Sequence, residues 1–385
     1  MGKRLALFFD GTWNTPKDIT RVHAAHKLVA ATPAQKTVYF RGLGTAKGQA
    51  FTGGIFARGL GKNVREGYQW LVENYEDGDD VFIFGFSRGS FTATSVLGMI
   101  MRFGLLRPGA TLTTDDIFDR YEKWDQHSRL YTLRFKQKNG KTDFTKEDQT
   151  LLDQSRRIKI KMLGIWDSVA TIGFPVGNFS RFSRKALKFH NPRPSSLYEN
   201  IFHALAVDEH RKGFRPILFH DYIHHTESPE QILENREKLE TRVEQRWFCG
   251  AHGDVGGGDN VQVSNAPYGW IISRAEDLGL ELNGTIPVTL NLPDAPLNDS
   301  YKKFLKGLYP ILRLGRRYQR KIGGHPTRKK DDVIEPIHET IDKSVFERWK
   351  ADPTYRPKNL RKLFQDDTRI NTQEGLYKIL PQDRH

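Results

Sequence analysis

One stretch decides the fold of this chain: Val81-Phe82-Ile83-Phe84-Gly85-Phe86-Ser87-Arg88-Gly89-Ser90. An apolar run rich in Val, Ile and Phe leads into Gly-Phe-Ser-Arg-Gly, and small residues at helical spacing follow. This order predicts a buried strand, a sharp turn that holds Ser87, and a helix that begins at Arg88. Gly85 and Gly89 flank the serine where a side chain would collide with the turn or with the helix behind it. The stretch indicates a nucleophilic serine at the end of a strand, with a purely structural strand–helix turn as the alternative.

Strand-like runs alternate with helical patterns on both sides of this stretch. A helix is predicted over residues 63–75, and His203, with apolar neighbours on both sides, is predicted to lie in a core helix. The runs predicted as strands are residues 5–9, 37–41, 80–86, 158–166 and 245–249, with a short one at 214–219. The alternation predicts an α/β-hydrolase-like fold, in which a mostly parallel central sheet carries helices on both faces.

Composition and segment character suggest how the chain is divided. We expect a catalytic core over residues 1–300, with a charged helical insertion at about 108–155, and a basic, mainly helical region over 301–385 packed on the core. The sequence has no run of eighteen apolar residues, so it predicts no transmembrane helix. It enters a strand at once and lacks a signal-peptide core, so we expect synthesis in the cytoplasm. The lone Cys249 excludes an internal disulfide and a thiolate metal cluster.

A serine hydroxyl needs a base, which is most often a histidine at the same rim of the sheet. His252 follows a short apolar strand in a glycine-rich loop and is the candidate base. Asp167 is the first polar residue after another predicted strand and is the candidate acid that orients it. Ser87, Asp167 and His252 then follow the chain order of α/β-hydrolases. Asp254 is a competing acid, and Asp254 paired with His338 is a further alternative.

Two other roles fall to residues near the strand ends. The backbone N–H of Arg88 and that of Gly11 or Thr12 are the candidate donors to an oxyanion. Asp10 could instead bind a metal together with Asp254 or Asp167. No His-x-x-x-His or clustered carboxylate spacing around Asp10, Asp167 or Asp254 supports a metal centre, so we predict no metal centre and no cofactor.

The net charge of +14 is concentrated in one segment. Residues 301–330 contain eleven Lys or Arg and no Asp or Glu. Apolar residues interleave with the basic ones over 301–313, as in an amphipathic helix that lies on a membrane, although Pro310 should break or kink such a helix. The alternative is a solvated basic face. The residues predicted to contact lipid or another anionic surface are Lys302, Lys303, Lys306, Arg313, Arg316 and Arg317.

Four sequence blocks resemble the family known as domain of unknown function 2235. They are Phe-Phe-Asp-Gly-Thr-Trp-Asn (8–14), Gly-Phe-Ser-Arg-Gly (85–89), Gly-Ile-Trp-Asp-Ser-Val (164–169) and Trp-Phe-x-Gly-Ala-His-x-Asp-Val-Gly-Gly-Gly (247–258). The resemblance extends from about residue 3 to 361. It implies an α/β-hydrolase-like core and a serine esterase or lipase with Ser87 as nucleophile. Some bacterial members are phospholipase effectors delivered by type VI secretion systems. Such delivery without a leader, with an immunity or secretion-system partner, is consistent with the absence of a signal peptide, and so is an ordinary cytosolic enzyme.

One leading functional hypothesis and two alternatives follow from the sequence. The leading hypothesis is a serine hydrolase of carboxylic esters, a phospholipase or lipase that acts on membrane lipid through Ser87, His252 and Asp167. One alternative is a protein that binds nucleic acid or an acidic partner on a degenerate hydrolase scaffold, with the basic segment as its binding surface. Another is a metal-dependent hydrolase that uses Asp10 and Asp254. No DNA- or RNA-recognition motif supports the binding protein.

Overall fold

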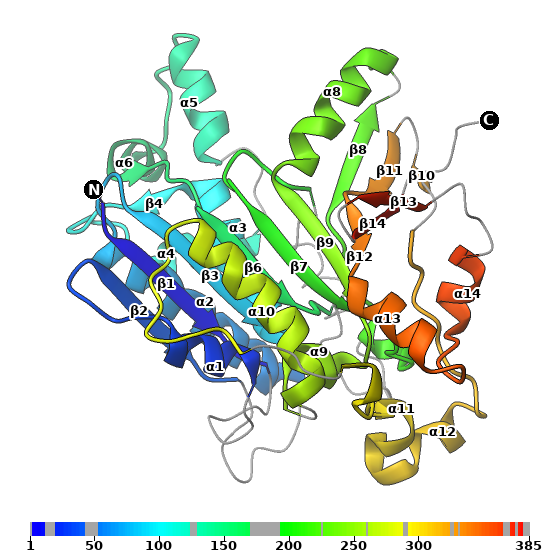
Figure 1. Cartoon of the computed structure of the whole chain (residues 1–385). Helices are drawn as coiled ribbons and strands as arrows, with labels where there is room; N and C mark the ends of the chain where they lie inside the picture. Colours follow the sequence, from blue (N-terminus) through cyan, green and yellow to red (C-terminus); the bar gives the residue numbers. More distant parts are fainter. Residues whose placement is uncertain are drawn as a thin grey trace.

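A large twisted sheet forms the centre of the molecule (Figure 1). The computed structural model describes residues 2–11, 20–42, 53–123, 129–169, 193–224, 226–258, 261–287, 292–323, 327–329, 332–364, 370–373 and 376–379. Within these residues nine strands make up the sheet, and the seven from β2 to β12 are parallel. β14 and β13 then extend it antiparallel. In spatial order the strands are β2 (Gln35–Phe40), β1 (Arg4–Phe9), β3 (Asp80–Phe86), β6 (Met162–Trp166), β7 (Ile201–Ala206), β9 (Val243–Phe248), β12 (Glu339–Ile341), β14 (Leu376–Ile379) and β13 (Ile370–Gln373).

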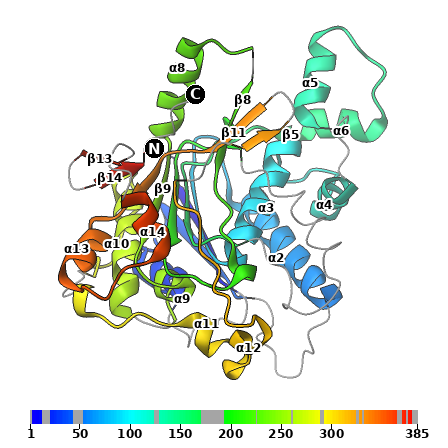
Figure 2. The same ribbon diagram turned by 90° about the vertical axis from the view of Figure 1, so that its right-hand side faces the viewer.

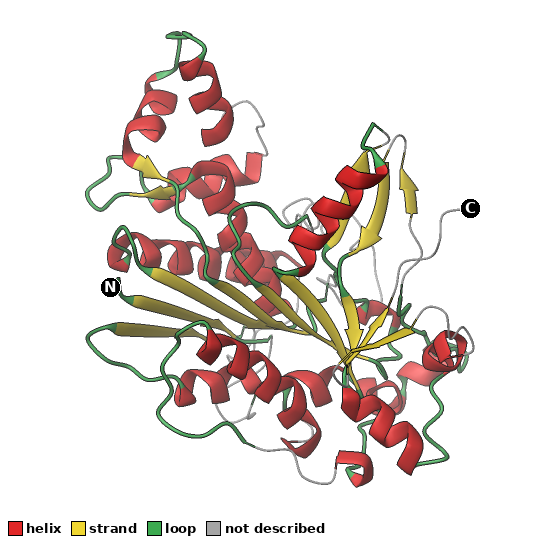
Figure 3. Cartoon of the chain, turned by 45° about the horizontal axis from the view of Figure 1, so that its top comes forward, coloured by secondary structure: helices red, strands yellow, loops and turns green. Residues whose placement is uncertain are grey.

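Helices cover both faces of the sheet, because successive side chains of each buried strand point to opposite faces (Figure 3). In β3, Val81 and Ile83 join the core beneath α2 (Gly53–Asn74) and α3 (Arg88–Phe103). Phe82 and Phe84 join the core beneath α1 (Arg21–Leu28) and α10 (Val261–Asp277). A continuous apolar run is therefore the sequence signature of this doubly covered strand. The predicted α/β-hydrolase-like fold is confirmed.

Two groups of elements lie outside this layered core (Figure 2). The segment over 108–155 contains α4 (Thr114–Lys123), α5 (Leu130–Lys138) and α6 (Lys146–Gln154). It is bordered by the short ladder of β4 (Leu105–Leu106) and β5 (Ser155–Arg156). The second group holds α8 (Pro229–Glu240) and a three-stranded sheet of β8 (His220–His224), β11 (Asp332–Pro336) and β10 (Thr327–Lys329).

The part of the chain beyond residue 300 contributes to the central sheet as well as covering it. β12, β13 and β14 come from this part, and α13 (Lys343–Ala351) and α14 (Lys358–Phe364) pack on a third apolar core. That core joins Trp247 of β9 to Ile341 of β12. The division of the chain at residue 300 stays a prediction.

Three local predictions are wrong. Residues 214–219 form no strand; a 3-10 turn, η2 (Lys212–Phe214), precedes β8, which starts at His220. His203 lies in a central strand, β7, and not in a helix, because pairing with β6 and β9 overrides the local preference of its small apolar neighbours. The helix predicted over 301–313 is broken into α11 (Ser300–Lys303), η4 (Phe304–Gly307) and α12 (Tyr309–Leu312). The break lies at Leu305 and Lys306, whose φ angles are both +53°.

Candidate active site

Ser87 lies in a strained turn between β3 and α3. Its φ and ψ are 56° and −120°, a backbone conformation that a residue with a side chain rarely adopts. The turn is tight because glycines allow backbone to approach backbone. A Cβ on Gly89 would lie 2.1 Å from the carbonyl oxygen of Phe9, and one on Gly85 would lie 2.7 Å from the Cα of Ser90. The geometry lifts the Ser87 hydroxyl above the carboxyl end of β3.

Two further strands deliver polar side chains to the same end of the sheet. Asp167 follows β6 directly, and its φ of 43° is also positive. His252 follows β9 and is the first residue of α9 (His252–Gly256). The carboxyl ends of parallel strands meet at one edge, where ligands of α/β proteins bind. The fold thus brings together three residues that are far apart in the sequence.

These three residues form a chain of hydrogen bonds. The Ser87 Oγ lies 2.8 Å from the Nε2 of His252. The Nδ1 of His252 lies 2.6 Å from the Oδ2 of Asp167. An ionised carboxylate only accepts, so Nδ1 carries the proton and Nε2 accepts the hydrogen bond of the serine hydroxyl. All three side chains are at least nine-tenths buried.

The electrostatics favour a neutral imidazole beside an ionised carboxylate. Burial lowers the pKa of His252 below its ordinary value, although Asp167 acts in the opposite direction. Burial alone would raise the pKa of Asp167, but the Arg320 guanidinium and His252 outweigh it and hold that pKa well below its usual range. At neutral pH this histidine can therefore accept a proton, which is the requirement for a general base.

Arg320 is a residue of this site that the sequence did not indicate. Its side chain is fully buried, and its guanidinium contacts both oxygens of Asp167. Nη1 lies 2.5 Å from Oδ1, and Nη2 lies 2.8 Å from Oδ2. The residue belongs to the basic 301–330 segment and lies outside the six residues predicted to contact an anionic surface. No motif surrounds it, so spacing alone could not have assigned it to the site.

Aromatic rings and a second ion pair enclose the imidazole. The rings of Phe86 and Phe214 lie with centroids 4.8 Å and 5.0 Å from that of His252. Glu209, which is fully buried, accepts hydrogen bonds from the backbone N–H of His252 and from Arg211. Burial acts to raise the pKa of Glu209, but the Arg211 guanidinium outweighs it and holds that pKa below its ordinary value. Two of these neighbours thus contact the ring of His252, and Glu209 holds its backbone.

The competing acid and base hydrogen-bond to backbone groups. Asp254 is buried and its Oδ2 accepts the backbone N–H groups of Ala251 and Asn298, 2.9 Å away in each case. His338 lies beside the amino-terminal end of β9, where its Nδ1 donates to the carbonyls of Glu240 and Val243. The structure therefore does not bring His338 to Ser87, which lies at the opposite end of the sheet.

Asp10 and Gly11, candidates for a metal ligand and an oxyanion donor, directly follow β1. Asp10 accepts hydrogen bonds from Thr20, from Tyr39 and from the backbone N–H of Gly11. Thr12 lies outside the described residues, and Arg88 is the first residue of α3. Among the described residues, no three His, Cys, Asp or Glu side chains are grouped to hold a metal ion.

The basic segment lies beside the site. Phe304 of η4 packs on Phe214, with ring centroids 5.9 Å apart, and Phe214 in turn packs on His252. The Oγ of Ser300, at the start of α11, donates to Glu209 at 3.0 Å. Of the six predicted surface residues, Lys302 and Arg317 pair with Asp299, and Lys303, Lys306 and Arg316 are exposed. Arg313 is partly exposed.

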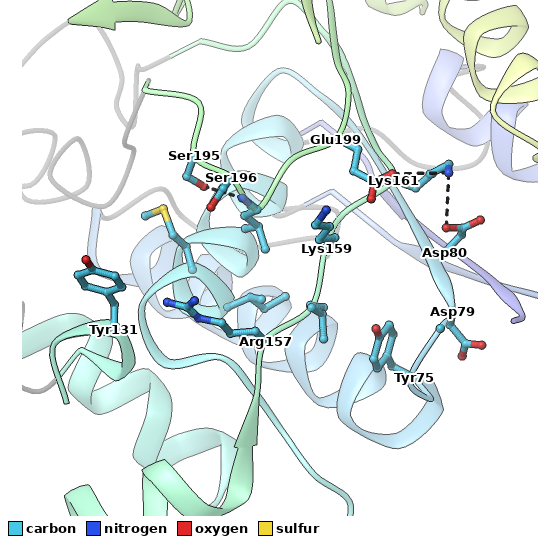
Figure 4. A pocket seen from close by; sticks show the side chains of 15 residues that line it. Tyr75, Asp79, Asp80, Tyr131, Arg157, Lys159, Lys161, Ser195, Ser196 and Glu199 are labelled. Carbon is cyan, nitrogen blue, oxygen red and sulfur yellow. Dashed lines mark hydrogen bonds and ion pairs between the residues drawn. The ribbon is translucent and has the colours of Figure 1, made fainter. Parts of the chain in front are cut away.

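A cavity of about 690 Å³ lies at the other end of the sheet (Figure 4). Lys161 bridges Asp80 and Glu199 in its wall, at 3.8 Å and 3.5 Å. Arg157 and Lys159 add positive charge. Ser87, Asp167 and His252 do not line it, so it is separate from the hydrogen-bond chain described above.

Among the helices of the described residues, none is long and apolar enough to cross a bilayer.

Comparison with other proteins provides the family context. Residues 3–274 match the family model described as T6SS, phospholipase effector Tle1-like, catalytic domain. The uncharacterized protein YEL023C of Saccharomyces cerevisiae is 27% identical over an alignment of 237 residues, which covers 57% of this chain and 33% of the yeast protein. The chain thus spans about a third of the length of that relative.

Solved structures show distant likenesses. An uncharacterized protein from Pseudomonas aeruginosa is 14% identical, with 73% of this chain and 46% of that one covered and a TM-score of 0.40. The Tle1 effector bound to the VgrG spike of the type 6 secretion system is 13% identical, with 83% and 81% covered and a TM-score of 0.34. The carboxylesterase Cest-2923 from Lactobacillus plantarum is 13% identical, with 74% and 89% covered and a TM-score of 0.34.

The family match covers most of the chain and includes all four sequence blocks that resemble domain of unknown function 2235, so that resemblance is confirmed. The chain belongs to the hydrolase family of T6SS phospholipase effector Tle1-like catalytic domains.

Proposed function

We propose that this protein is a serine hydrolase that cleaves the carboxylic esters of membrane phospholipids. The observation that carries the proposal is the continuous chain of short hydrogen bonds from Ser87 Oγ through His252 to Asp167, at 2.8 Å and 2.6 Å. Hydrogen bonds of this length satisfy the reach required between nucleophile, base and orienting acid. Family membership supports phospholipid as the substrate class.

The geometry supports a two-step acyl transfer. Ser87 Oγ attacks the acyl carbonyl while His252 Nε2 takes its proton, and Asp167 stabilises the imidazolium that forms. The imidazolium then protonates the leaving alcohol, which leaves an acyl group on Ser87. Water hydrolyses that acyl-enzyme by the same route in reverse, with His252 as the base. The fatty acid and a lysophospholipid are the products.

The developing oxyanion needs donors close to Ser87. We assign the backbone N–H of Arg88 as one donor, because Arg88 directly follows Ser87 at the start of α3, where the helix dipole favours negative charge. The second donor is assigned to Gly11 or Thr12. The N–H of Gly11 lies 2.7 Å from the Asp10 carboxylate, so its use would require this contact to be shared with substrate. Loss of one such donor costs about a hundred- to a thousandfold in kcat.

We further propose that the segment 302–317 docks the enzyme on an anionic membrane. Leu308, Ile311, Leu312 and Leu314 are 58%, 70%, 58% and 81% exposed, which is unusual for such large apolar side chains. Lys306 and Arg316, which are basic and exposed, flank these apolar residues in the sequence. Because Phe304 connects this segment through Phe214 to His252, a docked lipid surface would lie close to the reacting groups. In a bacterium, delivery by a secretion system and neutralisation by an immunity partner fit the same family membership.

The first test treats the purified protein with a fluorophosphonate probe and maps the labelled peptide. We expect labelling at Ser87 that is lost in both Ser87→Ala and His252→Ala. His338→Ala is the matched control, because its imidazole donates to backbone carbonyls beside the amino-terminal end of β9, and it should label like the wild type. Fatty-acid release from phosphatidylglycerol vesicles should follow the same pattern and persist in EDTA. Labelling that survives in His252→Ala but is lost in His338→Ala would transfer the base to His338.

The second test measures docking by co-sedimentation with vesicles. Ile311→Asp and Leu314→Asp should each weaken binding to phosphatidylglycerol vesicles about tenfold or more, since burial of one such side chain contributes about 1.5–3 kcal/mol. Leu233→Asp is the control, because this residue of α8 is similarly exposed, at 56%. Equal loss in all three variants would contradict a docking surface at 302–317. Tight, steeply salt-dependent binding of oligonucleotides with no ester turnover would support the nucleic-acid alternative.

A further inference from the structure

The carboxylate of Asp167 has a full set of hydrogen-bond donors. Its Oδ1 accepts from the backbone N–H of Ala206 at 3.0 Å and from Arg320 Nη1 at 2.5 Å. Its Oδ2 accepts from His252 Nδ1 at 2.6 Å and from Arg320 Nη2 at 2.8 Å. A carboxylate offers about four lone-pair sites, so every one is occupied. The two parallel bonds from the guanidinium fix the plane of the carboxylate as well as its position.

We propose that Arg320 is a positioning residue of the reaction, which holds Asp167, and through it His252, in the geometry that Ser87 requires. This inference rests on the proposed serine-hydrolase function and adds to it a fourth residue. Arg320 itself does not reach Ser87 or the reacting atoms. Its role is exerted on the carboxylate that orients the imidazole.

The surroundings of Arg320 support a fixed rather than an incidental contact. Its Nη1 also donates to the carbonyl of Ala206 at 2.9 Å, and its Nη2 to the carbonyl of Phe214 at 2.7 Å. Two residues earlier, Tyr318 exchanges hydrogen bonds with His210. The chain around residue 320 is therefore tied to the loop over 206–214. That same loop places the Phe214 ring against His252, so Arg320 supports the imidazole by two routes.

Arg320 also reduces the net negative charge next to the imidazole of His252. An isolated Asp167 carboxylate would strongly favour the imidazolium, whereas one already paired with a guanidinium favours it less. The other charged groups that face His252 are Glu209 and Arg211, which pair with each other. His203 lies behind Asp167, where its Nε2 accepts the N–H of Ser168. Removal of the Arg320 charge should therefore raise the pKa of His252 and move the acid limb of kcat/KM to higher pH.

The experiment compares Arg320→Met and Arg320→Lys with the wild type on a short-chain soluble ester. Arg320→Met removes charge and geometry, and we expect kcat/KM to fall about a hundredfold with the acid limb displaced upward. Arg320→Lys keeps the charge without the planar fork, so kcat should fall while the limb stays in place. Lys321→Met is the matched control, because it removes a neighbouring but exposed charge. Its kcat/KM and the pH of its acid limb should stay at wild-type values. Circular dichroism of each variant measures the folded fraction.

The outcomes separate this inference from the proposed function. Folded Arg320→Met with wild-type kcat and an unmoved or lowered acid limb would overturn the inference while Ser87 remained the nucleophile. If Arg320→Met does not fold, Arg320→Lys decides, and a wild-type kcat in that variant would overturn it. Turnover that persists in Ser87→Ala would instead overturn the proposed function. A merely structural role of Arg320 would lower the folded fraction without displacing the limb.

Discussion

Replacement of Asp167 by Asn should damage stability and activity through two separate effects. Asp167 and Arg320 form an ion pair in which both side chains are fully buried. Asp167→Asn leaves the guanidinium buried without a counter-charge, and loss of one partner of such a pair costs about 3–5 kcal/mol. Two backbone carbonyls still accept from Arg320, which favours the lower end of that range. A loss of about 3 kcal/mol lowers the ratio of folded to unfolded protein about 150-fold.

Activity should fall independently of folding. An amide at residue 167 can donate to Nδ1 of His252 and so favours the tautomer that cannot accept the Ser87 proton. Loss of the acid from a serine triad in this way lowers kcat by about four orders of magnitude. Urea unfolding followed by tryptophan fluorescence measures the first effect, and ester turnover by the folded fraction measures the second.

The double variant Asp167→Asn/Arg320→Met separates the two effects. It removes the unpaired charge, so it should regain much of the stability that Asp167→Asn loses while remaining inactive. The reasoning is refuted if Asp167→Asn unfolds at the wild-type urea concentration. It is also refuted if the losses of the two single variants simply add in the double variant, because the two side chains would then not be coupled.

Three further outcomes follow from features of the structure. Gly89→Ala should destabilise the protein by about 1–3 kcal/mol or more, because its Cβ would lie 2.1 Å from the Phe9 carbonyl oxygen, and it should suppress labelling of Ser87. The control is Gly269→Ala in α10, whose Cβ would meet only ordinary contacts and which should unfold like the wild type. Because burial lowers the pKa of His252, activity should be complete above the ordinary histidine pKa of about 6.5 and should be lost only as the pH falls below that value. A pH–rate profile with an acid limb above pH 7 would contradict this expectation. Burial raises the pKa of the Cys249 thiol to about 12, so iodoacetamide should leave the native enzyme unmodified and active, and mass spectrometry that finds rapid alkylation would disprove it.

The parts of the fold that could be predicted are those encoded locally. The strand Asp80–Phe86 agrees with its prediction residue for residue, because its apolar run and the two glycines after Phe84 specify both the strand and the turn. His203 could not be placed, because a short run with Ala and Leu neighbours fits a helix as well as a buried strand, and only pairing with β6 and β9 decides. The break of the helix at Leu305 and Lys306 could not be predicted either, since neither residue type indicates a positive φ.

The same distinction applies to the site. Ser87, Asp167 and His252 each follow a strand, so the rule that polar residues gather at the carboxyl ends of parallel strands was enough to group them. Arg320 follows no strand of the central sheet, and in sequence it is one of many basic residues in its segment. Burial next to Asp167 distinguishes it from its neighbours, and burial of this kind depends on how distant segments pack.

The late place of Arg320 in the chain has a consequence for biosynthesis. Proteins begin to fold from the amino terminus while they are still being made. A ribosome adds Ser87, Asp167 and His252 before Arg320, so on the proposals above an unfinished chain would hold the three reacting groups without the side chain that aligns them.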